Sequence, residues 1–302
     1  MRRGIFCRNK VLLFLFVEKR CAVCYTIKRV LFFKLGNKMK LNYCIADPAG
    51  NVTVIVTSPV KNDEYANISR MLMDKIDGAE QIGFLATPFM GGDIRLEMMG
   101  GEFCGNALRC AGLYFAKHRD GFTNGIVKVE LSGCDHVLDV FVDLDEDNAE
   151  AAMPLPVDSD IAMLWKTRIA DAVIFDGIVH CVSYQDHSDI KPAWLKESLR
   201  SLAIQYRTSA VGLIQVDKEK MEVTPIVYVV STDTMVYEGS CASGSEAVAV
   251  CLVEDESDGT YTYDLKEPGG VLRATVVKEN GKVASVKISS KIALKEENEI
   301  EL

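Results

Sequence analysis

The chain has 302 residues, a formal net charge of −9 and 48% hydrophobic residues. This composition is that of an ordinary globular protein, and the length suffices for about two domains. The acidic balance is a poor match for nucleic acid or anionic membranes, so we expect neither as a partner.

The first 38 residues differ from the rest of the chain in charge. They carry ten Lys and Arg against one acid, Glu18, and their longest apolar run has seven residues. Seven residues are too few to span a membrane, and no small-residue cleavage site follows them. We interpret residues 1–38 as a non-native or disordered extension before a start at Met39, with a transit or membrane-surface segment as the alternative. Removing this extension takes the net charge from −9 to −18.

The remaining chain contains β-rich runs and a few helical patterns. Runs of Val, Ile, Thr and Tyr bounded by Gly, Asp and Pro predict strands, and apolar residues at helical spacing or a first-turn proline predict helices. In chain order these are a strand region from Met39 to residue 56, a helix at 64–76, a helix at 106–120, strands at 126–131, 137–144 and 172–184, a helix at 192–203, strands at 209–217 and 224–230, a helix at 245–255, and strands at 271–277 and 283–289.

The order of strands, helix and strands occurs twice, which indicates two similar halves. The segment MPLPVDSD (153–160) carries two prolines and is a plausible hinge between them. We predict an α/β (α+β) fold of two domains, 39–153 and 154–302. Each has a curved, mostly antiparallel sheet or barrel around a central helix, and the active site lies in the cleft between them. This prediction allows the last strand of the chain to join the sheet of the first domain.

Two cysteines share an unusual setting, in EFCGNALRC (102–110) and EGSCASGSE (238–246). In each motif an acid precedes the cysteine, and small residues lead into a predicted helix. The start of a helix presents unpaired amides and the positive end of the dipole, which lower the pKa of a thiol and bind a carboxylate. Each motif therefore predicts a thiolate, Cys104 or Cys241, beside an anion-binding site.

Two such thiols on opposite sides of one small acid suit the inversion of a stereocentre. One base removes the α-proton, and an acid on the other face returns a proton. The chain has no Rossmann fingerprint, P-loop or pyridoxal-phosphate lysine context, so we predict no cofactor. Its histidines are scattered and its one C-x-x-C is Cys21 to Cys24, so we predict no metal site. Most other cysteines lie in apolar runs, and we expect them to be buried in the core as free thiols of a protein in the reducing cytosol.

FCGNA and SCASG resemble the two signature motifs of the diaminopimelate epimerase and proline racemase superfamily, whose members are cofactor-independent two-cysteine racemases. Within it, the chain is most similar to the histidine racemases of staphylopine-type metallophore biosynthesis. The resemblance implies a PLP-independent isomerase that converts L-His to D-His, and a cytoplasmic homodimer. It extends over most of the chain after Met39 through PAGN (48–51), EQIGF (80–84) and EPGG (267–270).

Two departures from diaminopimelate epimerases bear on the substrate. Glu238 is followed by Gly239 rather than by an arginine, and Ile178 replaces an asparagine in GIVH (177–180). Burying the distal carboxylate of diaminopimelate without an arginine is costly, which disfavours that substrate. The alternatives are a racemase or epimerase of another amino acid (diaminopimelate, lysine or hydroxyproline) and, outside enzymes, a redox-sensing cysteine pair.

The resemblance also assigns roles by position. Cys104 and Cys241 are the acid and base, and Asn51, Gln81 and Glu238 bind the α-amino group or the side chain. Cys110 is expected in the core, and His180 is expected to be structural. The α-carboxylate is held by the backbone amides of Gly105, Asn106, Ala242 and Ser243, where Ala242 replaces a glycine of most relatives but keeps its amide.

Overall fold

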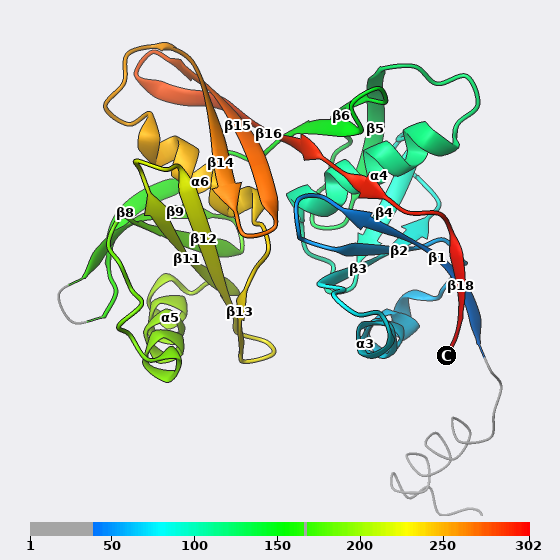
Figure 1. The fold of residues 1–302 in the computed structure, drawn as a ribbon, viewed down its shortest axis with the longest axis horizontal. Coiled ribbons are helices and arrows are strands. Elements are labelled where there is room, and N and C mark those ends of the chain that lie inside the picture. The colour runs from blue at the N-terminus through cyan, green and yellow to red at the C-terminus, as the bar shows by residue number, and fades with distance from the viewer. Residues whose placement is uncertain (1–38, 166–167) are drawn as a thin grey trace, which may run out of the picture. The chain divides into compact units, whose positions relative to one another are not determined.

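The computed structural model describes residues 39–165 and 168–302. Figure 1 shows the fold and gives the labels used below. The predicted extension 1–38 lies outside the described residues, so its interpretation stays a prediction. Residues 41–300 form one compact unit. Of the second unit the structure describes residues 39–40 and 301–302, where the backbones of Met39 and Leu302 exchange hydrogen bonds of 3.3 and 2.8 Å.

The N-terminal half is a mixed sheet around one buried helix. Its strands pair in sequence order, antiparallel except for the parallel pairs β2–β3 and β4–β5. Helix α4 (Gly105–His118) contacts β4 to β7, and Leu108, Ala111 and Leu113 lie in the hydrophobic core with no exposed surface. The other elements are β1 (Lys40–Asp47), β2 (Thr53–Val56), η1 (Asn62–Glu64), α3 (Tyr65–Lys75), β3 (Gln81–Ala86), β4 (Ile94–Met98), β5 (Gly125–Leu131), β6 (Leu138–Asp143) and β7 (Asn148–Ala152).

The C-terminal half repeats this plan, and each half has one further helix on its sheet, α3 on β3 in the first and α5 in the second. Helix α6 (Ala242–Leu252) contacts β10, β11, β15 and β16, and α5 (Pro192–Tyr206) packs on β11 and β12 (Figure 1). Each helix has its own hydrophobic core. The strands are β8 (Asp158–Met163), β9 (Ile169–Phe175), β10 (Ile178–Ser183), β11 (Ala210–Asp217), β12 (Glu222–Val229), β13 (Thr234–Tyr237), β14 (Gly259–Glu267), β15 (Gly270–Glu279) and β16 (Lys282–Lys291).

The end of the chain passes from the C-terminal to the N-terminal half. Strand β16 pairs with β15 on one side and with β7 on the other. The following β17 (Ala293–Leu294) pairs with β1, and Ile292 lies in the core around α4. The last strand, β18, comprises Asn298–Glu301. The boundaries of the two proposed domains remain a prediction.

The mixed α/β class predicted from the sequence is confirmed, but one strand prediction is wrong. The run 172–184 is a hairpin of β9 and β10, with Phe175 opposite Ile178. The Asp176–Gly177 pair makes the turn, and Gly177 has a φ of +84°, which a glycine adopts without strain. Part of the predicted hinge is also regular, because residues 158–160 belong to β8.

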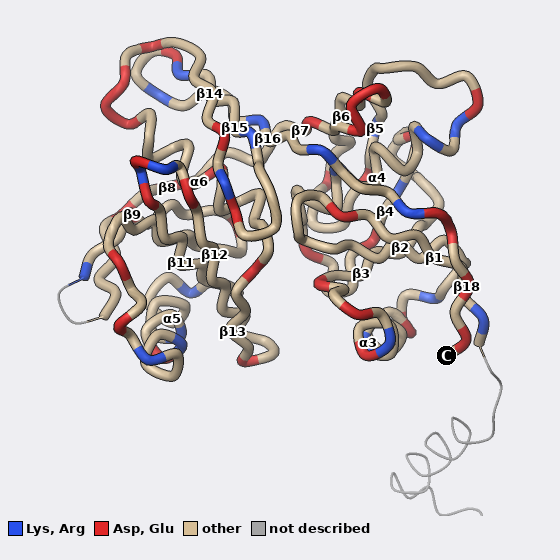
Figure 2. Tube along the Cα trace, in the orientation of Figure 1, with Lys and Arg blue, Asp and Glu red and all other residues tan. Residues whose placement is uncertain are grey.

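Charged residues are spread over both halves. Figure 2 shows Asp and Glu along many loops and strand ends, with Lys and Arg interspersed among them. None of the helices in the described part of the chain has the length and apolar character needed to cross a membrane.

Candidate active site

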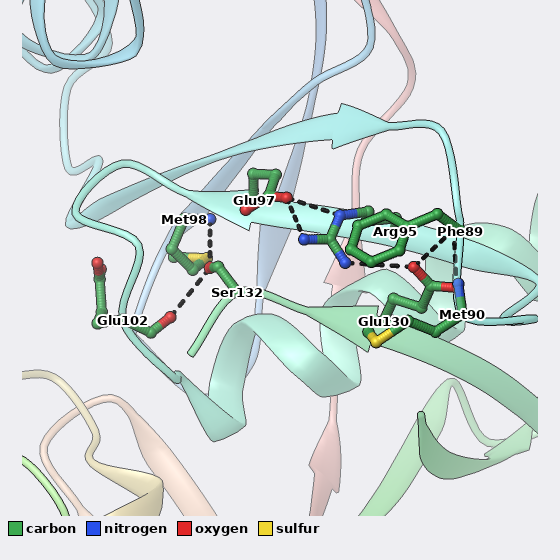
Figure 3. A network of polar contacts seen from close by, with 8 residues as sticks. All are labelled: Phe89, Met90, Arg95, Glu97, Met98, Glu102, Glu130 and Ser132. Carbon is green, nitrogen blue, oxygen red and sulfur yellow. Dashed lines mark hydrogen bonds and ion pairs between the residues drawn. The ribbon is translucent and has the colours of Figure 1, made fainter. Parts of the chain in front are cut away.

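Cys104 caps the start of α4, as the sequence predicts. Its backbone is extended, with φ −140° and ψ 112°, and its Sγ accepts a hydrogen bond from the Ala107 amide at 3.5 Å. Ser132, directly after β5, fixes the turn that precedes Cys104, since its Oγ accepts from the Met98 amide at 2.8 Å and donates to the Glu102 carbonyl at 3.1 Å (Figure 3). The end of β4 and the turn before α4 are thus tied to the same side chain.

Cys241 occupies the N-cap position of α6 with nearly the same backbone, φ −135° and ψ 107°, but its side chain makes no cap hydrogen bond. The helix begins at Ala242, three residues before the predicted start at 245. The amide of Cys241 donates to Glu267 Oε2 at 2.6 Å, and its Sγ lies 3.6 Å from Ser243 Oγ. The two cysteines therefore occupy equivalent positions on two helices.

The two helix starts meet in the fold. A Cβ placed on Gly105, the first residue of α4, would lie 3.1 Å from the Cβ of Ala242, the first residue of α6. Asn106 Nδ2 donates to the carbonyl of Ser240 at 3.3 Å. The two predicted catalytic cysteines, Cys104 and Cys241, thus lie at two helix starts that meet, together with four of the predicted substrate-binding residues: Gly105, Asn106, Ala242 and Ser243.

A crossing of three loops holds the neighbouring segments against each other. The Gly269 amide donates to the Gly239 carbonyl at 2.8 Å, and Ser240 Oγ donates to the Pro48 carbonyl at 3.2 Å. A Cβ on Gly239 would overlap the carbonyl of Gly50, so no larger residue fits at this crossing. The PAGN, EGSC and EPGG segments, far apart in the sequence, are therefore neighbours in the fold.

Asn51 and Gln81 form a buried polar cluster next to Cys104. Gln81 Nε2 donates to Asn51 Oδ1, and to Thr53 Oγ1 at 2.9 Å. Burial raises the pKa of the Cys104 thiol, and a hydrogen bond with Gln81 is one of the contacts that oppose this increase. The structure places both predicted residues at the site.

Glu238 and Glu80 bring two carboxyl groups to the site, one from each half. Burial raises the pKa of Glu238 to about 7, and the charge of Glu80 contributes to this increase. A hydrogen bond with the Cys241 thiol acts in the opposite direction. Glu80 accepts from Asn51 Nδ2 at 2.7 Å and also from the Gly239 amide, and burial raises its pKa too. Sequence reasoning missed Glu80, although it stands directly before Gln81 in EQIGF.

The predicted lowering of the cysteine pKa values is wrong for this structure. Burial is the largest influence on the Cys104 thiol and raises its pKa, outweighing hydrogen bonds with Ala107, Gln81 and Asn106 that lower it. The free energy lost by removing a thiolate from water exceeds the free energy gained from its hydrogen bonds with the amides at the helix start. Cys104 is therefore a thiol at neutral pH in this state.

The pKa of Cys241 is raised further. Burial acts first, the negative charges of Glu238 and Glu267 add to it, and hydrogen bonds with Ser243 and Gly244 only partly offset them. Glu267 is itself buried, which raises its own pKa to about 8. The two thiols are therefore equivalent in backbone but not in electrostatic surroundings.

His180 was expected to be structural, and the structure places it directly behind the site. It is fully buried on β10, and its Nε2 lies 2.8 Å from Ser243 Oγ, which in turn neighbours Cys241. Burial lowers the pKa of His180 to about 3, so the ring is neutral and orients the Ser243 hydroxyl. The apolar strand around it concealed this contact in the sequence.

Other predictions concern cysteines and metals. Cys110 lies in the core around α4, as expected. Cys44 and Cys181 are buried and Cys251 is half-buried, whereas Cys21 and Cys24 lie outside the described residues. Within the described residues, no three side chains of His, Cys, Asp and Glu come together in a way that could hold a metal ion.

Comparison with solved structures shows the fold. A predicted epimerase from Pseudomonas aeruginosa matches with a TM-score of 0.59 and 12% identity, over 86% of this chain and 99% of the other. A probable proline racemase from Agrobacterium radiobacter K84 matches with a TM-score of 0.59 and 10% identity, over 85% and 92%.

Comparison with known sequences shows the family. The histidine racemase of Staphylococcus aureus (strain Mu50 / ATCC 700699) is 26% identical over 79% of this chain and 89% of its own length. That of Fusobacterium nucleatum subsp. nucleatum (strain ATCC 23726 / VPI 4351) is 28% identical over 82% and 89%. The model of the histidine racemase CntK N-terminal domain matches residues 40–299. Since this match spans most of the chain, the protein belongs to the histidine racemase family that the model describes.

Proposed function

We propose that this protein is a histidine racemase that interconverts L-His and D-His by proton transfer at Cα between Cys104 and Cys241. The observation that carries the proposal is the meeting of two helices that each begin at a cysteine, with Gly105 against Ala242. Membership of the histidine racemase family supports the substrate.

The reaction needs a base on one face of Cα and an acid on the other. The thiolate of one cysteine takes the α-proton, the electron pair of the C–H bond passes into the carboxylate, and the thiol of the other cysteine returns a proton to the opposite face. The second cysteine is then the thiolate and starts the reverse reaction. The amides of Gly105, Asn106, Ala242 and Ser243 stabilise the negative charge that accumulates on the carboxylate.

The carboxyl groups of Glu80 and Glu238 favour a cationic substrate group. Both are half-buried, burial raises the pKa of each, and the charge of Glu80 raises the pKa of Glu238 further. An ammonium or imidazolium between them would relieve this repulsion, whereas the distal carboxylate of diaminopimelate would add to it. Asn51 and Gln81 supply neutral donors and acceptors beside them.

Exchange of the α-proton with solvent tests the proposal. Purified protein is incubated with L-His in D2O, loss of the α-proton is followed by NMR, and D-His is measured by chiral chromatography. We expect exchange and an equal mixture of enantiomers. Faster exchange with lysine, a hydroxyproline or diaminopimelate would reassign the substrate, and no exchange with any amino acid would overturn the racemase proposal.

Variants test the two thiols. Cys104→Ser and Cys241→Ser are each expected to abolish racemisation, since a serine hydroxyl is a far weaker acid than a thiol. The matched control is Cys251→Ser near the other end of α6, which should keep nearly full activity. Near-normal turnover in either site variant would refute the two-base assignment.

Three further parts of the proposal rest on the family resemblance. They are that the protein is a homodimer, that it is located in the cytoplasm, and that its D-histidine is used in metallophore biosynthesis. Analytical ultracentrifugation tests the first of these. A purely monomeric protein that racemises histidine at full rate would refute the dimer and leave the activity intact.

A further inference from the structure

Arg109 is a buried cation that the two-base reaction does not use directly. It is the largest fully buried side chain of the described residues, at 0% exposure, on the second turn of α4. Its guanidinium donates to the Gly105 carbonyl at 3.3 Å, to Asn106 Oδ1 and to Ser290 Oγ on β16. These acceptors are all neutral, so the hydrogen bonds satisfy the donors without neutralising the charge.

The Asn106 side chain extends this arrangement to the second cysteine turn. Because Arg109 donates to Oδ1, the amide must turn its Nδ2 away, and Nδ2 donates to the carbonyl of Ser240. Ser240 directly precedes Cys241. Arg109 therefore fixes the orientation of the group that bridges the two motifs.

The charges around the two thiols are unequal. Arg109 is electrostatically coupled to Cys104, Cys110 and Glu267, and the acid that acts on Cys104 is Glu102. Cys110 is coupled to Arg109 more strongly than Cys104 is, but it has no exposed surface and cannot reach a substrate. Of the two cysteines at the site, Cys104 is the one whose turn the buried Arg109 contacts directly, through the Gly105 carbonyl and Asn106 Oδ1.

Cys241 is surrounded by acids rather than by a cation. The charged groups that act on it are two acids, Glu238 and Glu267, while Ser243 and Gly244 provide neutral hydrogen bonds. Ionising Cys241 would place a third negative charge among these acids. Ionising Cys104 instead places a negative charge at the turn that the buried cation Arg109 contacts.

We propose that Arg109 is a positioning residue that makes Cys104 the first thiolate of the pair and leaves the proton on Cys241, while its bond to Asn106 holds the two turns together. The proposal rests on the proposed function for its meaning in racemisation. Its test needs no substrate, so the two can fail separately.

The test is the pH dependence of alkylation of the full chain by iodoacetamide, read for each cysteine by mass spectrometry of its peptide. In the wild type, Cys104 should react at lower pH than Cys241. Arg109→Met should slow the alkylation of Cys104 at pH 8 about 10-fold, which corresponds to one pKa unit. Arg109→Lys keeps the charge and should stay within about 3-fold of the wild type on the same scale.

Lys278→Met provides the matched control. Lys278 is another buried cation, whose Nζ donates to the carbonyls of Val253, Glu254 and Glu256 at 2.9, 2.6 and 2.8 Å beyond the far end of α6. Its loss disturbs a buried charge of the same sign without touching the Cys104 turn. We therefore expect the alkylation profile of Cys104 to be unchanged in this variant.

Arg109→Gln gives the same measurement with a polar side chain if Arg109→Met does not fold. Two outcomes overturn the proposal: a Cys104 profile that is unchanged in the charge-free variants, or a wild type in which Cys241 reacts first. If the pH dependence of Cys104 alkylation shifts equally in Arg109→Lys and Lys278→Met, the shift is a general effect of packing. This outcome also refutes the proposal.

Discussion

The side-chain amide of Asn106 donates a 3.3 Å hydrogen bond to the backbone carbonyl of Ser240. This bond joins the residue two positions after one cysteine of the site to the residue directly before the other. The distance between the two thiols therefore depends on a buried polar contact between segments far apart in the chain.

Asn106→Ala removes this bridge. We expect kcat for histidine racemisation to fall at least about 10-fold, because small displacements of reacting groups are costly, while KM changes less. The free energy of unfolding should fall by about 1–3 kcal/mol, since the Ser240 carbonyl and Arg109 lose a partner. Asn298→Ala, at an exposed position of β18, is the control. Equal losses in kcat for both variants would contradict this role.

Gly239→Ala tests the loop crossing. The added methyl would overlap the Gly50 carbonyl, so we expect a loss of about 1–3 kcal/mol in the free energy of unfolding, together with reduced activity. Gly125→Ala is the matched control, because the nearest atom to its Cβ is 4.0 Å away. Urea unfolding measures the stability of both variants. If the Gly239 variant is as stable as the Gly125 variant, the loops at the crossing can move apart without cost.

His180→Phe should lower activity about 10-fold or more through the lost orientation of Ser243. Because the pKa of His180 is about 3, the ring is neutral throughout the working range. The shape of the pH–rate profile above pH 5 should therefore be unchanged. His187→Phe removes a second buried histidine, which bonds to Ser183 Oγ at 2.8 Å, and serves as the control. A lost ionisation in the His180 variant would contradict a neutral ring.

Glu130→Gln should change the acid stability of the protein. Glu130 accepts hydrogen bonds from the amides of Phe89 and Met90 and pairs with Arg95 at 3.2 Å (Figure 3), and it also accepts from the Gly92 amide at 3.0 Å. These contacts lower its pKa from 4.5 to about 2. The unfolded chain binds the proton first, so this stabilisation is complete above pH 4.5 and is lost as the pH falls toward 2.

Urea unfolding between pH 3 and pH 7 checks this prediction. The Gln variant should be less stable than the wild type at pH 7, and the difference should shrink at pH 3. Asp139→Asn on the exposed Lys128 pair is the control. A difference that stays constant with pH would contradict the assignment.

Glu238→Gln should stabilise the protein at alkaline pH while reducing its activity. The folded pKa of Glu238 is about 7 against an ordinary value of 4.5. The folded state therefore keeps a proton that the unfolded chain has lost, and stability falls as the pH rises from 4.5 to 7. Thermal unfolding at pH 6 and pH 8 should show a smaller decrease for the variant. An unchanged decrease would mean that Glu238 ionises freely in the folded state.

The sequence predicted the local part of this protein well. Small residues after Cys104 and Cys241 indicated two helix starts, and both helices begin there after a cysteine with extended backbone; Cys104 also accepts a hydrogen bond from the first turn. The mixed α/β class followed from β-rich runs between a few helices. The hairpin at Asp176–Gly177 was missed, although the turn signal was present within the run.

Only the tertiary structure decided what these local features do together. The meeting of Gly105 with Ala242, the approach of Glu80 to Glu238 and the burial of Arg109 all involve partners that no spacing in the chain specifies. The direction of the cysteine pKa shifts also changed, because helix-start amides act locally whereas desolvation depends on everything packed around the thiol. Backbone conformation at the two cysteines is a local property of the sequence, and their acidity is a property of the assembled core.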